Sequence, residues 1–195
     1  MLCASTVGLI GSVDCSMLTE RMNPNSQQFS EGRVASLHLH PATPGTPLQS
    51  TESVEFVEAK GIVGDARYFG RLSRTTGRPT RRQVTLMERE QIAEHAAAMG
   101  LESIPPGAVR SNVETTGIDL VRLVGHEVMV GEAVLFFSEP RDPCEKMDAI
   151  CQGLRELMLN DRQGVLAEVR QSGKVRVGDV IRVVPKPSSE GSANP

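Results

Sequence analysis

Aromatic residues are scarce in this sequence, which contains no Trp and one Tyr. Proteins that bind single-stranded nucleic acid stack its bases on aromatic side chains, so the composition argues against that role. The formal net charge of −3 gives no general attraction to nucleic acid or to a membrane surface. Apolar runs long enough to span a bilayer, about 18 residues or more, are also missing. We therefore expect no nucleic-acid partner and no membrane partner.

Cysteine is scarce as well, and the residues Cys3, Cys15, Cys144 and Cys151 form no CxxC pair. Small secreted scaffolds use many closely spaced cysteines, so this usage is typical of a reducing compartment. Basic residues are missing before Arg21, which makes the start of the chain a poor secretory or mitochondrial signal. We expect a cytoplasmic protein.

The length of 195 residues, with 39% hydrophobic and 23% charged residues, is typical of one soluble globular domain. Residues 1–31 become polar toward their end, and we expect an extension of low order there. The domain itself is expected over residues 32–185. The Ser-rich residues 186–195 are expected to form a disordered tail.

Short apolar and alternating stretches predict a chain made mainly of strands. The pattern predicts two helices. The first begins with a capping box at residues 85–88 and ends at Gly100, and the second runs from Pro143 to Asn160. These elements predict a mixed α+β fold, a small β-barrel with flanking helices. The predicted strands lie at 34–39, 53–58, 83–87, 127–130, 132–138, 165–170 and 175–184, the last two as a hairpin through Ser172 and Gly173.

The stretch from Arg141 to Glu145 joins an apolar strand to the second predicted helix. Asp142 suits the N-cap and Pro143 the first helical position, which places Cys144 in the first helical turn. The helix dipole and the neighbouring Arg141 favour an ionised thiol at that position. The alternative is that Cys144 is a small buried hydrophobic residue, as unpaired cysteines often are.

Positive charge is concentrated between Lys60 and Arg82. Seven basic residues and the single acid Asp65 give this segment a charge of +6, against −9 for the rest of the chain. Because glycines and a proline interrupt residues 67–82, we expect a loop over a binding face. An anionic small ligand suits such a loop, and a solvated basic loop is the alternative. The basic residues are Lys60, Arg67, Arg71, Arg74, Arg78, Arg81 and Arg82.

Three parts of the sequence can contribute to one site: the basic segment, Arg110 with Asn112, and Cys144. Guanidinium groups bind phosphate with forked donors, and an Asn amide can read the donor and acceptor edge of a heterocycle. A thiolate is a ligand for a thiophilic metal. This combination favours an anionic cofactor that carries such a metal.

Short motifs follow one another in a characteristic order and spacing between about Arg33 and Val184. They are Gly61-Ile62-Val63-Gly64-Asp65, Arg82-Gln83-Val84, Pro106-Gly107 leading to Arg110-Ser111-Asn112-Val113, Gly125 to Gly131, Arg141-Asp142-Pro143-Cys144, and Gly173 through Gly178-Asp179. In this order the chain resembles the MOSC domain family, named after the C-terminal domain of molybdenum cofactor sulfurase. The sequence departs from the family at Ser111, where an acidic residue is common.

The resemblance implies a β-barrel that holds the molybdenum cofactor, a phosphorylated pterin (molybdopterin) with the metal on a dithiolene. It implies that Cys144 is the metal ligand or the sulfur-carrying residue, and that Arg82, Arg110 and Asn112 lie in the pocket. The family is also associated with pyridoxal phosphate binding. The full set of expected cofactor-binding residues is Arg67, Arg81, Arg82, Arg110, Asn112 and Arg141.

The leading hypothesis is a stand-alone MOSC protein that reduces N-hydroxylated compounds, with Cys144 as the catalytic metal ligand. A non-catalytic carrier of the cofactor, or of a persulfide on Cys144, is the alternative, and a barrel that serves only as an interaction module is a third. The expected partners are the anionic pterin cofactor and an external electron donor or cofactor-delivery partner. Fuller reductases of the family carry an additional N-terminal barrel region or a C-terminal helical extension, and we expect neither in this chain. We also expect no aminotransferase-like sulfurase domain.

Overall fold

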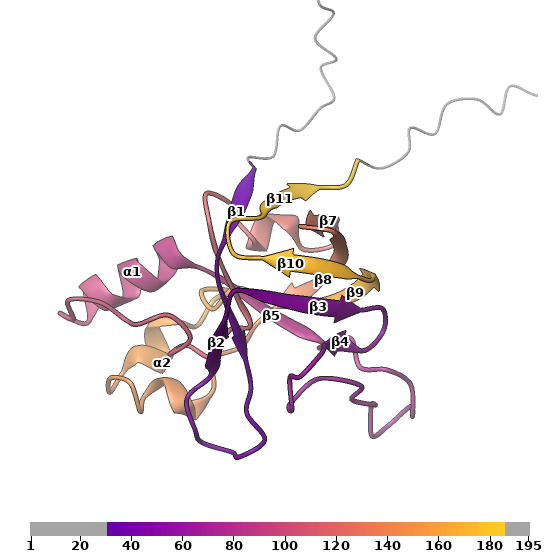
Figure 1. Ribbon diagram of the computed structural model, residues 1–195. Coiled ribbons are helices and arrows are strands. Elements are labelled where there is room, and N and C mark those ends of the chain that lie inside the picture. Colours follow the sequence, from indigo (N-terminus) through magenta and orange to yellow (C-terminus); the bar gives the residue numbers. More distant parts are fainter. Residues whose placement is uncertain (1–30, 186–195) are drawn as a thin grey trace, which may run out of the picture.

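The computed structural model describes residues 31–185. Apart from residue 31, the extension expected over 1–31 lies outside the described residues, as does the tail expected over 186–195. The described chain is a mixed α+β fold with a small β-barrel, as the sequence predicts (Figure 1). The strands are β1 (Gly32–Leu39), β2 (Gln49–Thr51), β3 (Ser53–Val57), β4 (Gly61–Ile62), β5 (Val84–Glu88), β6 (Val113–Thr116), β7 (Glu127–Val130), β8 (Ala133–Pro140), β9 (Val165–Gln171), β10 (Gly173–Arg176) and β11 (Val180–Val183). The helices are α1 (Arg89–Ala98) and α2 (Leu154–Leu157), with the 3₁₀ turns η1 (Val121–Leu123) and η2 (Glu145–Met147).

Seven strands close the barrel in the order β1, β6, β5, β9, β8, β7 and β11, because β11 pairs back onto β1. These pairs are antiparallel except that of β5 with β6, which is parallel. Along β8, Ala133, Leu135 and Phe137 are buried, while the residues between them are partly exposed. This period of two points one face of each strand inward, and the inward side chains form a continuous apolar cluster.

Strands β10, β3 and β4 form a separate three-stranded sheet. The hairpin expected between residues 165–170 and 175–184 is wrong, because β10 pairs with β3 while β11 pairs with β7 and β1. Gly178 has a φ of +88° and turns the chain inside the expected second strand. The local apolar pattern therefore locates the strands but not their partners.

Helix α1 begins one turn later than its expected capping box. Thr85 lies in β5, and Glu88 at the N-cap makes no side-chain cap hydrogen bond, so the prediction of a capping box is wrong. The helix ends just before Gly100, whose φ is +67°, as predicted. Among residues 31–185, no helix has the length and apolar character needed to cross a bilayer.

The long helix expected over 143–160 is also wrong, because the segment forms only η2 and the four-residue α2. Gly153, with a φ of +90°, interrupts it. The Asp148 carboxylate accepts hydrogen bonds from the backbone N–H groups of Gly153 and Arg155, both at 3.1 Å, and stabilises a turn instead. Several apolar residues of the segment nevertheless pack into the apolar cluster of the helical flank. Those that are fully buried are Met147, Leu154 and Met158.

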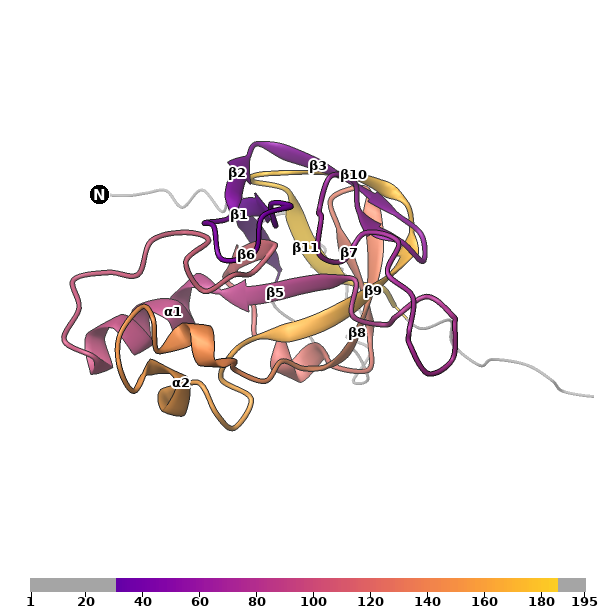
Figure 2. The same ribbon diagram turned by 90° about the horizontal axis from the view of Figure 1, so that it is seen from below.

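Both helices lie on one flank of the barrel, and the loop between β4 and β5 lies on the opposite side (Figures 1 and 2). As predicted, this basic segment is a loop. Its one β-bridge within the described chain joins Leu72 to Pro79. The loop after β8 carries Cys144 and is called the cysteine loop below. It leads from the barrel toward the helical flank (Figure 2).

Candidate functional site

Cys144 lies on the loop that leaves the barrel after β8. It is the N-cap of η2 and has an extended backbone, with φ −104° and ψ 165°, so it does not lie inside a helical turn as predicted. A single 3₁₀ turn lacks the aligned peptide dipoles of a full helix, so the helix dipole expected beside Cys144 is not formed. The thiol is free and exposed. The alternative of a buried hydrophobic residue is wrong.

Arg141 fastens the loop of residues 109–111 to the cysteine loop. Its Nη1 donates to Ser111 Oγ at 3.0 Å. Its Nη2 donates to the carbonyl oxygens of Val109 and Arg110 at 3.2 and 3.3 Å. These bonds give the two loops a fixed relative position, which also determines where the Arg110 backbone lies.

The charges around Arg141 show which side chains are close to it. Burial lowers the pKa of the Arg141 guanidinium below its ordinary value. Tyr68 and Cys144, when ionised, act in the opposite direction, whereas Arg67 and Arg110 lower the pKa further. Three of the other predicted site residues, Arg67, Arg110 and Cys144, therefore each lie within range of the Arg141 charge.

Arg110 has two features of a ligand-binding position. Its φ of +61° lies in the left-handed region, which costs about 1–2 kcal/mol for a residue other than glycine. Its Nη1 donates to the carbonyl oxygen of Thr46 at 3.1 Å, but its buried Nε has no hydrogen-bond partner among the described residues. A buried donor without an acceptor costs about 1–3 kcal/mol, and a bound anion would supply the acceptor.

Asp65 anchors the turn that presents Arg67. Its Oδ1 accepts hydrogen bonds from the N–H groups of Arg67 and Tyr68 at 3.0 and 2.9 Å, and its Oδ2 lies 2.8 Å from His40 Nδ1. Burial alone would raise the pKa of Asp65, but the hydrogen bonds from His40 and Tyr68 outweigh it and lower the pKa. The exposed Arg67 guanidinium lies 5.3 Å from the centre of the Tyr68 ring.

Asn112 is buried behind these arginines. Its Oδ1 accepts hydrogen bonds from the backbone N–H and the hydroxyl of Thr85, at 3.2 and 2.9 Å. Its Nδ2 donates to the carbonyl oxygen of His38 at 3.1 Å and to Asp65 Oδ2 at 2.7 Å. Because these bonds occupy both the oxygen and the nitrogen of the Asn112 side-chain amide, the geometry favours a role in positioning the Asp65 turn. The expected contact with a heterocycle stays a prediction, and it requires one of these bonds to break.

Arg81 and Arg82 face carboxylates on strands β9 and β8. Arg81 Nε lies 3.6 Å from Glu168 Oε2, and Arg82 Nε lies 3.0 Å from Glu139 Oε1. Both side chains are more than half exposed, and neither is among the charges that act on Arg141 most strongly. The structure therefore gathers Arg67, Arg110 and Arg141 near Cys144 but directs Arg81 and Arg82 toward other partners.

Glu114 stabilises the loop that carries Arg110, and this role was not expected from the sequence. Its fully buried carboxylate accepts hydrogen bonds from the N–H of Gly107 at 2.8 Å, from Arg89 Nη1 at 3.1 Å and from the Ser36 hydroxyl at 3.0 Å. It thereby links β1, β6, α1 and the loop that carries Arg110. Sequence reasoning also missed Asp65 and Tyr68. The Gly61–Asp65 turn motif was the available signal for Asp65.

The donor set determines what this site can hold. Among residues 31–185, no three His, Cys, Asp or Glu side chains are arranged to bind a metal ion. The single thiol of Cys144 therefore fits a metal whose other ligands come with a bound organic group. The clustered guanidinium groups, with the unpaired Nε of Arg110, fit a phosphate. These residues match a metal-bearing, phosphorylated cofactor of the kind that the sequence resemblance implies.

Comparisons with known proteins agree with the fold. The MOSC domain family matches residues 37–182. A search among curated proteins found no match to the chain.

Solved structures with a similar fold include the YuaD protein from Bacillus subtilis. Its TM-score is 0.67, with 24% sequence identity over 80% of this chain and 97% of that chain. YiiM from Geobacillus stearothermophilus has a TM-score of 0.59 and 16% identity, over 81% of this chain and 77% of that one. YiiM from Escherichia coli has a TM-score of 0.56 and 20% identity, over 82% of this chain and 71% of that one. At these identities the likeness shows a shared fold.

Proposed function

Because the chain belongs to the MOSC domain family, we propose that it binds the molybdenum cofactor and reduces N-hydroxylated compounds. This family is associated with that cofactor. The observation that carries the proposal is the exposed thiol of Cys144 beside the guanidinium groups of Arg67, Arg110 and Arg141.

Each of these residues has a distinct task in the proposal. Arg67, Arg110 and Arg141 hold the phosphate of the pterin, and the unpaired Nε of Arg110 gains an acceptor. Cys144 Sγ is the protein ligand of the metal. When bound, the cofactor supplies two-electron redox chemistry at its metal.

The protein contributes position and charge. The three hydrogen bonds from Arg141 hold the loop of residues 109–111, and Asp65 holds the turn of Arg67, before any anion binds. The guanidinium charges offset the negative charge of the cofactor. The exposed position of Cys144 leaves the reacting centre open to substrate and to an electron donor.

The test is to purify the protein from cells that make the cofactor, and then to measure its molybdenum and pterin content and its reduction of a hydroxylamine. We expect stoichiometric metal in the wild type and loss of metal and turnover in Cys144→Ala. Cys151→Ala is the matched control, because Cys151 is also a free cysteine but packs against the apolar cluster of the helical flank. Metal content that survives Cys144→Ala unchanged would defeat the proposal.

A second candidate is a sulfur or cofactor carrier, and the free, exposed thiol of Cys144 favours it. In this role the Cys144 thiolate attacks the terminal sulfur of a donor persulfide, an S–S bond breaks, and the donor leaves as a thiolate. A mass increase of about 32 Da on the Cys144 peptide, one sulfur atom, would support it if the protein shows no turnover with reductant. If the protein binds no pterin and carries no sulfur, the barrel is left as an interaction module.

A further inference from the structure

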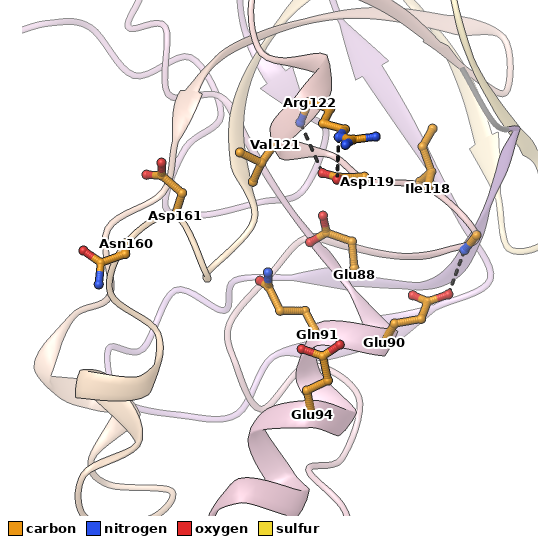
Figure 3. A pocket seen from close by; sticks show the side chains of 11 residues that line it. Glu88, Glu90, Gln91, Glu94, Ile118, Asp119, Val121, Arg122, Asn160 and Asp161 are labelled. Atoms are coloured by element: carbon orange, nitrogen blue, oxygen red, sulfur yellow. Dashed lines mark hydrogen bonds and ion pairs between the residues drawn. The ribbon is translucent and has the colours of Figure 1, made fainter. Parts of the chain in front are cut away.

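An acidic cavity lies on the helical flank, and Arg67, Arg110, Arg141 and Cys144 are not among its lining residues. Its volume is 590 Å³, and it opens between α1, the chain around η1 and the loop after α2 (Figure 3). Five of its lining residues are acidic, and one is basic. The acidic residues are Glu88, Glu90, Glu94, Asp119 and Asp161, and the basic residue is Arg122.

Glu88 is the unusual member of this group, because it is buried and only half satisfied. The residue is 6% exposed, and its Oε1 accepts a hydrogen bond from the N–H of Leu120 at 2.8 Å. Its Oε2 is buried without a hydrogen-bond partner among the described residues. The carboxylate points into the cavity (Figure 3). A buried carboxylate oxygen without a donor is costly, so a donor that enters the cavity would be bound favourably.

Three of the other carboxylates already have partners. Glu90 accepts a hydrogen bond from the N–H of Gly117 at 2.8 Å. Asp119 Oδ2 lies 3.5 Å from Arg122 Nε. The third pair joins Glu94 to Arg162 at 3.0 Å. Among the described lining residues, the buried side-chain oxygens without a hydrogen-bond partner are Glu88 Oε2 and Gln91 Oε1, and only that of Glu88 belongs to a carboxylate.

We propose that this cavity binds an aliphatic primary ammonium group, from a small free amine or from a lysine side chain, with Glu88 Oε2 as its principal acceptor. Among the described residues no acidic set is arranged to hold a metal ion, which favours an organic cation. Ile118 and Val121 in the lining offer apolar contact to methylene groups next to the ammonium. Nothing in this proposal depends on the molybdenum cofactor.

The electrostatics of the cavity give the proposal a pH signature. Burial raises the pKa of Glu88, and the charges of Asp119 and Glu90 act in the same direction. Glu94 and Asp161 add negative charge to the cavity, while Arg122 adds positive charge. A bound cation favours the ionised carboxylate, so binding displaces a proton from Glu88 whenever it is protonated. Affinity should therefore rise with pH until Glu88 of the free protein is fully ionised.

The experiment is calorimetric titration of the full chain with 1,4-diaminobutane at low ionic strength. We expect saturable millimolar or tighter binding to the wild type and a loss of about tenfold or more in Glu88→Gln. Gln can still accept the hydrogen bond from the N–H of Leu120. The matched control is Glu102→Gln, which makes the same change at an exposed site outside the cavity. Thermal unfolding shows whether each variant is folded.

Two further arms keep the test decisive if Glu88→Gln does not fold. Asp161→Asn at the exposed rim should weaken binding about threefold, and wild-type affinity should rise with pH. A blocked lysine amide, titrated in parallel, distinguishes a lysine side chain from a free amine as the ligand. Equal binding by wild type and folded Glu88→Gln, or no saturable binding of either probe to the wild type, would overturn the proposal.

Discussion

Ser111 determines the charge that Arg141 presents to a ligand. The fully buried Ser111 Oγ accepts a hydrogen bond from Arg141 Nη1 at 3.0 Å. An acidic residue at this position would place a carboxylate against the guanidinium and neutralise it. A neutral hydroxyl leaves the positive charge available to a bound anion.

Ser111→Asp should therefore weaken the binding of inorganic phosphate about tenfold, because the new carboxylate competes for Arg141. Ser111→Ala is the control, since it removes the hydrogen bond without adding charge. Titration calorimetry at constant ionic strength measures both variants. Unchanged phosphate affinity in Ser111→Asp would show that Arg141 does not contribute to anion binding.

Gly107 lies where the loop of Arg110 passes close to His38. Its φ is +79°, and a Cβ atom added there would lie 2.8 Å from His38 Nδ1. Gly107→Ala should lower the free energy of unfolding by about 2–4 kcal/mol, from the strained φ and from the steric clash together. Gly45→Ala is the matched control, because its φ of +88° is similar but no atom lies within 4 Å of the added Cβ. Urea denaturation of both variants isolates the steric part, and equal losses would contradict it.

Whole elements were predictable where the deciding interactions are local. Strands such as β1 and β8 follow from short apolar stretches at residues 34–39 and 133–137, and α1 ends at Gly100 as expected. The prediction of a helix over 143–160 was wrong because Gly153 and the Asp148 carboxylate favour a turn, and the spacing of apolar residues does not report either effect. The hairpin failed because strand partners are chosen by contacts between distant parts of the chain.

The Glu114 carboxylate connects several elements, so its loss should affect all of them together. Glu114→Gln keeps the shape of the side chain but leaves Arg89 without its ion-pair partner and weakens the bond from the Gly107 N–H. We expect a loss of about 3 kcal/mol in the free energy of unfolding, because breaking a buried pair leaves a polar group unpaired. Urea denaturation measures this, with the exposed Glu102→Gln as control. A loss in Glu114→Gln no larger than in the control would contradict the linking role.

At the scale of the whole molecule, closure of the barrel brings the site together. Arg67, Arg110 and Arg141 come from three separate loops. The basic segment of the sequence pointed to Arg67, and the motifs pointed to Arg110, Arg141 and Cys144. Residue type and motif order could not show that Arg81 and Arg82 face the carboxylates of Glu168 and Glu139. The direction of a loop side chain depends on the surface beneath it, and that surface is made by strands far away in the sequence.

The dependence of stability on pH also belongs to the whole molecule, and His95 provides a test. His95 is 1% exposed and lies on α1, with its Nε2 2.9 Å from the carbonyl oxygen of Arg162 beyond α2. Burial lowers the pKa of His95 below 6.5, so the unfolded chain binds this proton more readily than the folded one. The contribution of His95 to stability is therefore fully present above about pH 6.5 and is lost as the pH falls below it.

We expect urea denaturation to show a smaller loss of stability between about pH 7 and pH 5 in His95→Gln than in the wild type. His38 keeps part of the slope in both proteins, because burial lowers its pKa as well. Glu88, whose raised pKa acts in the opposite sense, is common to both proteins, so the difference between the two curves isolates His95. Parallel curves would mean that His95 titrates alike in the folded and unfolded chains, and that the contact between α1 and the chain beyond α2 is open to water.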